Sequence, residues 1–368
     1  AFSVRGNGEE GYRLELALSL PVLTWEFDSP LDQAVAHRCS SLYLPEGTSH
    51  MMPERLGLDL YSLHAGRSRP VLWVSLDLGP EGEVISVSPR LTWAEVERNT
   101  TYAKTEEELD SPEPGQLATA LEVAEKLRRN RIRSGAVIFD QKDPLIHVRE
   151  EDGEPRVDLE AAPEYPRAQL MVTEIMILAN SVLSDWATSE GVPLFHRCQD
   201  ISLPPGFAGE WTDPVDMHRI IKEMAGSKLD IRPGPHTSLG VQGYAPITSP
   251  LRRYVDFLNL AQVRNHLLGD PLLWDEAGME SLLPHLSARS QAVGRIQKFR
   301  TRYWKLLYCQ RWCNFRTWEG IVLEADELIT VSLPREQLLL RAPKKLFGEK
   351  VHPGQRYRIT LGKIDPLN

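Results

Sequence analysis

Cysteine and long apolar runs are both scarce in this sequence, and each scarcity excludes a class of protein. The 368 residues include only four cysteines, Cys39, Cys198, Cys309 and Cys313, whose spacing matches no disulfide framework. Cys309 and Cys313 lie one helical turn apart without a matching second pair, which argues against a zinc site. No segment approaches the roughly 18 uninterrupted apolar residues of a membrane span. We therefore expect reduced thiols, a cytoplasmic location and no membrane contact.

The pattern of a secretory leader is also missing. The longest early apolar run, Leu14 to Leu23, is broken by Glu15, Ser19 and Pro21 and follows no basic segment. The chain has no initial Met and begins directly in a strand-like stretch. We expect from this abrupt start that the sequence enters its first domain in mid-strand.

Basic residues are outnumbered by acidic ones. The chain has 42 Lys and Arg against 51 Asp and Glu, which gives a net charge of −9 and argues against a non-specific polyanion binder. A local basic channel stays possible, because the field depends on how charges are distributed. The length and a 42% hydrophobic composition allow two or three domains with a sizeable core.

Periodicity divides the chain into a long part that mixes strands and helices and a short strand-rich end. Alternating residues predict two hairpins, at 1–23 around N-G-E-E-G and at 71–91 around G-P-E-G-E. A short strand that includes Phe139 is predicted at 135–140, and a polar hairpin is predicted at 146–159. Helical spacing predicts helices at 32–37, 117–133, 167–187, 262–268, 274–286 and 287–316. From Trp318 onward, short strands alternate with turn signals.

The stretch Tyr244 to Asp256 reads Y-A-P-I-T-S-P-L-R-R-Y-V-D and carries the strongest local signal. Ser249 is a good N-cap and Pro250 a good first helical residue, so a helix is predicted to begin there. Arg252 and Arg253 would then oppose the positive end of the helix dipole. They fit that place if an anion is held between them and the free amides. Surface ion pairs are the alternative explanation.

The predicted helix at 287–316 contains no acidic residue. Aromatic residues alternate with the cations, which is a pattern of single-strand nucleic-acid channels. The alternative is a helix whose aromatics pack inward while its cations are solvated, and we favour it for most of these residues. The basic residues are Arg289, Arg295, Lys298, Arg300, Arg302, Lys305, Arg311 and Arg316.

Several blocks together resemble the ribonuclease II (RNB) family of 3′→5′ exoribonucleases. They are T-S-P-L-R-R-Y-V-D at 248–256, P-H-T-S-L-G at 235–240, E-I-M-I-L-A-N at 174–180 and the run from S-P-L-D-Q-A at 29–34 to M-M-P-E-R-L-G at 51–57. The resemblance implies an α+β fold, with an RNB catalytic domain (a mixed sheet with packed helices) at about 1–316. A small all-β OB-fold barrel that guides RNA would follow at 317–368.

The resemblance also implies roles for individual residues. Arg252 would neutralise charge on the scissile phosphate, and Arg253 would orient the strand or brace that site. Tyr43 would contact RNA near the scissile end, Tyr102 would be a second RNA-contacting tyrosine, and Phe139 would clamp terminal bases. Taken alone, Tyr43 and Phe139 also fit core positions on strands.

For two polar residues the implied partners stay open. Glu174 lies in an apolar helix and needs a partner, which the family suggests is a ribose hydroxyl or an arginine; a surface glutamate at the helix edge is the alternative. For His236 we expect packing or a phosphate contact, because a two-metal mechanism needs no protein base.

The implied activity is processive hydrolysis of single-stranded RNA to nucleoside 5′-monophosphates by two Mg²⁺ ions, in a monomer. In the family, carboxylates of the form D-x₅-D-x-D-D hold these ions and directly precede a segment like A-F-S-V. Ala1 starts this segment here, and Leu20 stands where a further family aspartate is expected. No metal ligand is therefore predicted within the chain.

Two explanations of these departures stay open. Either the carboxylates lie just before Ala1, which we favour, or the chain is a degenerate relative that binds RNA without cutting it. A deoxyribonuclease is a more distant alternative, and it would be indifferent to the 2′-hydroxyl.

Overall fold

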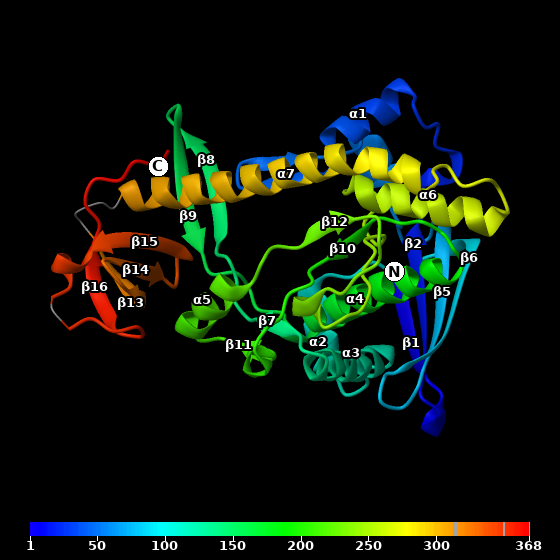
Figure 1. Cartoon of the computed structure of the whole chain (residues 1–368), viewed down its shortest axis with the longest axis horizontal. Helices are drawn as coiled ribbons and strands as arrows, with labels where there is room; N and C mark the ends of the chain where they lie inside the picture. Colours follow the sequence, from blue (N-terminus) through cyan, green and yellow to red (C-terminus); the bar gives the residue numbers. More distant parts are fainter. Residues whose placement is uncertain (312–315, 349, 368) are drawn as a thin grey trace.

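A four-stranded antiparallel sheet stands at one end of the molecule in the computed structural model, which describes residues 1–311, 316–348 and 350–367 (Figure 1). The strand order is β1-β2-β5-β6, and both predicted hairpins are confirmed, with Val4 opposite Leu14 and Leu76 opposite Val87. Alternation buries Leu14, Leu16 and Leu18 on one face of β2. The strands are β1 (Phe2–Gly6), β2 (Tyr12–Ser19), β5 (Ser68–Leu78) and β6 (Val84–Glu95).

The prediction of a mixed sheet is wrong for this sheet. All three of its strand pairs are antiparallel. For β1–β2 and β5–β6 this follows from the short connections between the strands, which reverse the chain. Among the described strands, the one parallel pair is separate from this sheet and consists of β7 (Val137–Phe139) and β11 (Gly209–Trp211). The fold class remains mixed α and β.

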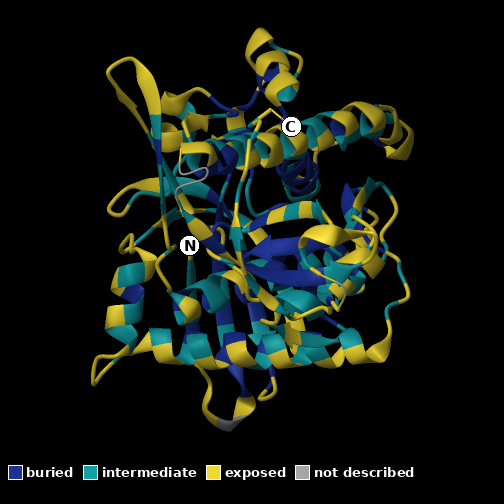
Figure 2. Cartoon of the chain, turned by 90° about the vertical axis from the view of Figure 1, so that its left-hand side faces the viewer, coloured by how far each residue is buried: buried dark blue, intermediate teal, exposed yellow. Residues whose placement is uncertain are grey.

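Helices cover the buried face of the sheet and form the main core with it. They are α3 (Gln116–Arg133), α4 (Pro166–Ser189) and α6 (Tyr254–Leu268). Val123, Ile175 and Phe257, one from each helix, join Leu16 and Leu76 in a single apolar cluster. Figure 2 shows buried residues gathered inside the molecule, with exposed residues along the outer faces of the helices. This burial explains why the predicted apolar stripes at 117–133 and 167–187 are confirmed as helices.

Shorter elements connect the sheet to the helices. A π-helical turn, η3, spans Arg55–Leu60, and the predicted polar hairpin near 146–159 is confirmed as β8 and β9. The other α-helices and strands before α7 are α1 (Pro30–Arg38), β3 (Leu42–Leu44), β4 (Gly47–Ser49), α2 (Tyr102–Leu109), β8 (Leu145–Glu151), β9 (Glu154–Glu160), β10 (His196–Cys198), α5 (Pro214–Glu223) and β12 (Lys228–Asp230).

One helix, α7 (Glu276–Arg311), runs from the region of α6 to the opposite end of the molecule (Figure 1). The predicted break between 286 and 287 is wrong, because α7 continues through Pro284. Met279 and Leu286, on either side of this proline, are both buried in the main core, and that packing outweighs the lost hydrogen bond. The helix was predicted to end at Arg316, which is not helical, and residues 312–315 before it fall outside the described residues.

A second antiparallel sheet, of order β15-β14-β13-β16, follows α7. Trp318, Leu333 and Leu338 of this sheet region pack on Leu306 and Cys309 of α7, so the end of the helix is part of its core. The OB-type barrel that the sequence suggests stays a prediction. The strands are β13 (Thr317–Ala325), β14 (Leu328–Leu333), β15 (Leu338–Pro343) and β16 (Arg356–Thr360).

Two expectations from composition can be compared with the structure. Cys39, Cys198 and Cys309 are buried free thiols, whereas Cys313 lies outside the described residues. Among the described helices, α4 alone is long and apolar enough to cross a membrane. More than half of its apolar window is buried inside the fold, which is typical of a core helix.

Candidate functional site

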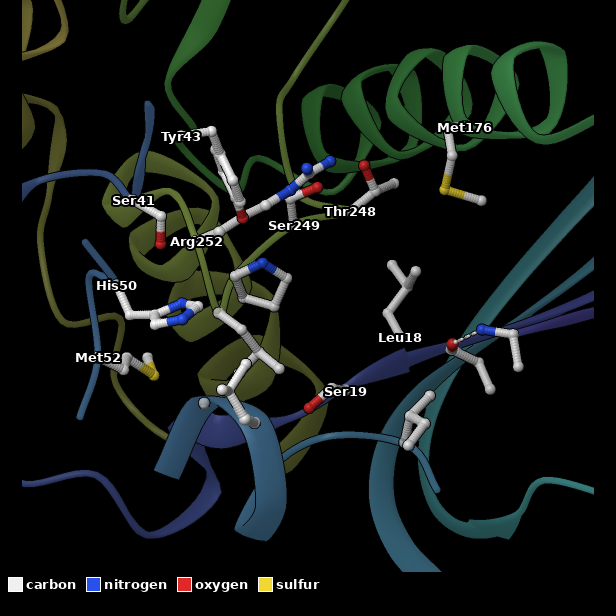
Figure 3. Close-up of a pocket in the computed structure, with 17 residues that line it drawn as sticks. Leu18, Ser19, Ser41, Tyr43, His50, Met52, Met176, Thr248, Ser249 and Arg252 are labelled. Carbon is white, nitrogen blue, oxygen red and sulfur yellow. Dashed lines mark hydrogen bonds between the residues drawn. The ribbon is translucent and has the colours of Figure 1, made fainter. Parts of the chain in front are cut away.

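A hollow of about 330 Å³ opens where the end of β2 meets the segment before α6. Ala17, Leu18 and Ser19 of β2 line the hollow. Leu18 and Ser19 lie on one side of it, whereas Tyr43 and Arg252 lie at the opposite end (Figure 3). The wall is mostly apolar, with a few hydroxyl groups and one guanidinium. The other lining residues are Ala1, Ser41, His50, Met52, Gly57, Leu58, Leu63, Met176, Thr248, Ser249, Pro250 and Leu251.

The predicted start of the helix at Ser249 and Pro250 is wrong. Residues 249–252 form a turn, Arg253 has extended backbone angles, and α6 begins at Tyr254. A distant segment holds the chain in this form: Ser41 N–H donates to Arg252 O at 3.0 Å and Tyr254 N–H to Cys39 O at 2.8 Å. These sheet-like bonds compete with helical ones, so the arginines precede the helix instead of occupying its first turn.

Asp256, fully buried in the first turn of α6, is the anchor of this turn. Its Oδ1 accepts from Ser249 N–H at 2.9 Å and from Arg253 Nη2 at 2.8 Å. Burial raises the pKa of Asp256, and the adjacent Arg253 partly opposes that effect. Arg253 is therefore committed to an internal ion pair, which fits the bracing alternative of its predicted role.

Arg252 has the opposite environment to its neighbour. Its side chain is exposed at the hollow. Within the described parts of the chain, no acidic group lies in salt-bridge range of its guanidinium and no hydrogen bond holds it. Its backbone carbonyl, in contrast, accepts from Ser41 N–H and from Ser40 Oγ, both at 3.0 Å. Arg252 thus presents an uncompensated cation on a fixed backbone, which suits anion binding.

Tyr43 lies on β3, directly after the segment that pairs with Arg252. Its side chain is 48% exposed and borders the hollow, so the core position considered from sequence is wrong. An exposed aromatic ring beside a free guanidinium can stack on a base while the cation binds its phosphate. The sequence signal for Tyr43 came only from the family resemblance.

Glu174, on α4, belongs to an internal ion cluster. Its Oε1 accepts from Arg131 Nη2 at 2.7 Å and from Arg128 Nε at 3.1 Å, and its Oε2 accepts from Arg131 Nε at 2.7 Å. Arginine, one of the two expected partners, is therefore present, and the surface alternative is wrong. The ribose contact stays a prediction, for which the fully buried side chain offers no exposed surface.

His236 lies away from the lining of the hollow and is almost fully buried. Its ring packs edge-on against Tyr244 at a centroid distance of 5.8 Å, and its backbone N–H donates to Val241 O. Burial, with a smaller contribution from nearby Arg197, lowers the pKa of His236 to about 4. A neutral ring at neutral pH fits the packing expectation better than a phosphate contact.

Tyr102 and Phe139 do not line the hollow. Tyr102, the first residue of α2, is exposed and stacks on Tyr165 with centroids 6.5 Å apart. Phe139 ends β7 opposite Trp211 and is half-buried. The RNA contacts predicted for both residues remain predictions, and the structure gives them no shared geometry with Arg252.

Sequence reasoning did not assign a role to two residues that build the site. Asn180 accepts from Ile247 N–H at 3.0 Å and donates to Thr248 Oγ1 at 3.3 Å, so it fixes the segment that enters the hollow. It ends the motif E-I-M-I-L-A-N, which was the available signal. His50 also lines the hollow, and no pattern indicated it.

The residues present do not fit a divalent metal site. In the residues that the structure describes, no group of three or more His, Cys, Asp or Glu side chains is placed to hold a metal ion. The end of β2 contributes Ala17, Leu18 and Ser19 to the hollow, none of which has a carboxylate. The described chain thus supplies a cation and an aromatic ring to the hollow but no oxygen cage for Mg²⁺.

Comparison with known proteins shows which protein family the chain belongs to. The model of the RNB domain matches residues 1–205 and 206–269, and the chain therefore belongs to the RNB family. It is 28% identical over 380 residues to an uncharacterized ribonuclease of Synechocystis, across 99% of this chain and 55% of that protein. It is also 28% identical over 305 residues to the chloroplastic/mitochondrial ribonuclease II of Arabidopsis thaliana, across 80% of this chain and 38% of that one. The chain thus spans about half or less of these relatives.

Solved structures show the same fold. The Dss1 exoribonuclease of Candida glabrata, an active-site mutant, matches with a TM-score of 0.84 at 19% identity, over 100% of this chain and 51% of that one. RNase R of Mycoplasma genitalium in complex with ribose-methylated single-stranded RNA gives 0.81 at 15%, over 100% and 67%. Yeast Ssd1, a pseudonuclease, gives 0.72 at 17%, over 93% and 47%. The fold therefore occurs in nucleases and in a pseudonuclease.

Proposed function

We propose that this chain is the RNA-binding and phosphate-positioning part of a 3′→5′ exoribonuclease that acts processively on single-stranded RNA. The observation that carries the proposal is the free guanidinium of Arg252 beside the exposed ring of Tyr43, at a hollow in a chain of the RNB family. Such a pair offers one group to a phosphate and one to a base. The expected products are nucleoside 5′-monophosphates.

In this proposal, different residues of the chain bind the phosphate, hold the turn and stack on the bases. Arg252 binds the scissile phosphate and stabilises the charge that grows on it during displacement. Arg253 and Asp256 hold the turn in place, so Arg252 needs no rearrangement on binding. Tyr43 stacks on a base near the 3′ end, and Phe139 and Tyr102 would contact further nucleotides.

The metal requirement is a separate part of the proposal. The family implies two Mg²⁺ ions, but the described residues do not fit them, and we derive no step through a metal from this chain. Ala1 borders the hollow on the β2 side, where it pairs with Ala17, so carboxylates attached directly before it would reach the hollow from the side that faces Arg252. We propose that position for the ligands.

We further propose that residues 317–368 form an OB-type barrel that guides single-stranded RNA. The four antiparallel strands of the C-terminal sheet and their attachment to α7 support this. A monomer that acts in the cytoplasm completes the proposal; the three described cysteines are free thiols, which supports the location.

The second candidate is an RNA-binding protein of the same fold without catalysis. It is favoured by Leu20, which is buried where the family resemblance expects an aspartate, and by the lack of a metal-ligating cluster among the described residues. This candidate keeps every RNA contact and loses only the chemistry.

The test uses the natural chain that contains these 368 residues and a 5′-labelled single-stranded RNA. Binding followed by a ladder shortened from the 3′ end, in Mg²⁺ and not in EDTA, is the expected result. Binding without cleavage would select the non-catalytic candidate. Absence of RNA binding would refute both.

A further inference from the structure

Among the described residues that line the hollow, three have ionisable side chains: Tyr43, His50 and Arg252. Arginine and tyrosine side chains keep one charge state near neutral pH, whereas an imidazole gains or loses its proton between about pH 5 and 8. His50 is therefore the side chain through which pH can change the charge of the hollow, and the proposed function gives it no role.

The backbone on both sides of the His50 side chain is fixed. The carbonyl of His50 accepts from Arg38 Nη1 at 3.1 Å, and the next N–H, that of the fully buried Met51, donates to Ser41 Oγ at 2.9 Å. Ser41 N–H in turn donates to the carbonyl of Arg252 at 3.0 Å. Ser41 thus bonds to both of the segments that bring His50 and Arg252 to the hollow.

The ring of His50, in contrast, has no hydrogen bond to any residue that the structure describes. Its Nε2 lies 4.0 Å from Glu54 Oε1, which is beyond hydrogen-bond distance. The side chain is 25% exposed, and it lies on the side of the hollow that Tyr43 and Arg252 occupy, opposite Leu18 (Figure 3). A partly buried imidazole on a fixed backbone is thus available to a ligand in the hollow.

Histidines that serve only the fold have a different environment in this chain. The ring of His196 shares a hydrogen bond of 3.1 Å with Ser184, and the ring of His236 packs edge-on against Tyr244. Both are almost fully buried, and burial lowers the pKa of each to about 4. His50 has neither this burial nor a partner for its ring, so packing alone does not explain its place in the hollow.

We infer that His50 is a second phosphate-binding group of the hollow and that it binds as the imidazolium ion; this inference rests on the proposed function. Charged groups of both signs lie on the neighbouring segments. Glu54 favours the charged imidazole, whereas Arg38 and Arg252 oppose it. A phosphate bound at Arg252 offsets these cations and favours the charged form. The hollow should therefore take up a proton when it binds RNA.

The apolar wall of the hollow increases the effect of this proton. Met52, Leu58 and Met176 line the hollow, so a charge inside it is screened less than one on an open surface. A charged imidazole adds one charge-assisted hydrogen bond to the phosphate, which strengthens binding roughly tenfold. The affinity of the hollow for RNA should thus rise as pH falls from about 8 to about 6.

The experiment measures binding of an oligouridylate of about four nucleotides to the 368-residue chain in EDTA, by titration calorimetry. The oligonucleotide has no terminal phosphate, and neither uracil nor a phosphodiester titrates near neutral pH, so a pH effect belongs to the protein. The unmodified chain should bind roughly tenfold more tightly at about pH 6 than at about pH 8. Binding enthalpies in two buffers with different heats of ionisation should show net proton uptake.

Two substitutions separate the charge of His50 from its shape. His50→Gln keeps a hydrogen-bonding side chain without the charge, so it should show no proton uptake and bind weakly at both pH values. His50→Lys keeps the charge, so it should bind tightly at both. The matched control is His285→Gln, an exposed histidine of α7 outside the lining, which should leave the pH profile unchanged. Urea unfolding of each variant checks that the fold is retained.

The amino group of Ala1 also titrates in this range. It donates to Ala17 O at 2.8 Å on the β2 side of the hollow, and burial lowers its pKa to about 6. If His50→Gln keeps the proton uptake of the unmodified chain, that proton belongs to Ala1 and the inference is wrong. Weaker binding of His50→Gln by the same factor at both pH values would also overturn it, because the loss would then come from shape.

The proposed function fails in a different way. If the unmodified chain binds no oligonucleotide at either pH value, the hollow is not an RNA site at all. If it binds equally well at both values and His50→Gln has no effect, the proposed function stands and His50 is not a phosphate-binding group.

Discussion

Glu174 gives the clearest test of whether a buried charge on α4 serves the fold or the RNA. The variant Glu174→Ala removes a carboxylate that accepts three hydrogen bonds from Arg128 and Arg131. The buried guanidinium of Arg131 then keeps only the carbonyl of Leu239, at 2.7 Å. Loss of one partner of a buried pair costs about 3–5 kcal/mol.

That loss is large against the total stability of a folded domain, about 5–15 kcal/mol. The midpoint of urea unfolding should therefore fall sharply for Glu174→Ala. Glu174→Gln should cost less, about 1–3 kcal/mol, because the amide oxygen still accepts from a guanidinium. The matched control is Glu210→Ala: Glu210 pairs with the same Arg128 at 3.3 Å but is about half exposed, so its removal should cost less than about 1 kcal/mol.

RNA affinity, measured on the folded fraction, separates the two roles of Glu174. A structural carboxylate predicts that Glu174→Gln keeps RNA affinity while stability falls. If Glu174→Gln leaves the unfolding midpoint unchanged and lowers RNA affinity instead, Glu174 contacts the RNA directly and its assignment to the fold is refuted.

Four further predictions concern chemistry, specificity and pH. In the natural chain, Arg252→Ala should lower turnover about 10²–10³-fold with little loss of folding or RNA affinity, and Arg252→Lys should not rescue fully; an unchanged rate would make the hollow the wrong site. A DNA oligonucleotide should be cut far more slowly than RNA of the same sequence, and equal rates would exclude recognition of the 2′-hydroxyl. Deletion of 317–368 should weaken RNA capture more than cleavage of a bound short oligonucleotide, and unchanged affinity would refute the guiding role. Burial lowers the pKa of His196 and of His236 to about 4. Between pH 6.5 and 4 the unfolded chain therefore binds more protons than the folded chain, and the free energy of unfolding should fall as pH drops through this window. If His196→Asn leaves this pH dependence unchanged, the titration of His196 is not its cause.

The elements that could be predicted from sequence are those whose signals are local. Both hairpins of the first sheet followed from alternation and a turn signal, since a strand with one buried face must alternate. The helices α3 and α4 followed from apolar stripes that the core requires. In each case the residues that determine the structure lie within the element itself.

The start of α6 could not be predicted, because its determinants are distant in sequence. Ser249 and Pro250 satisfy the local rules for a helix start, yet the backbone of Arg252 and Tyr254 pairs with residues 39–41. Over 200 positions separate these partners. No local rule reveals such competition between backbone pairings. The exposure of Arg252 and the pairing of Arg253 with Asp256 both depend on it.

The orientation of Arg252 depends partly on two residues outside the lining of the hollow, Asn180 and Asp256. Asn180 fixes residues 245–248 on one side of the turn, and Asp256 fixes Ser249 and Arg253 on the other. Ser41 holds the carbonyl of Arg252 itself. A phosphate-binding cation on a loop would otherwise lose conformational freedom on binding, which costs affinity and rate. Because three separate parts of the chain fix this turn, the loop can position a charge as precisely as a helix would, and substitutions at Asn180 or Asp256 should lower activity without removing any group that touches RNA.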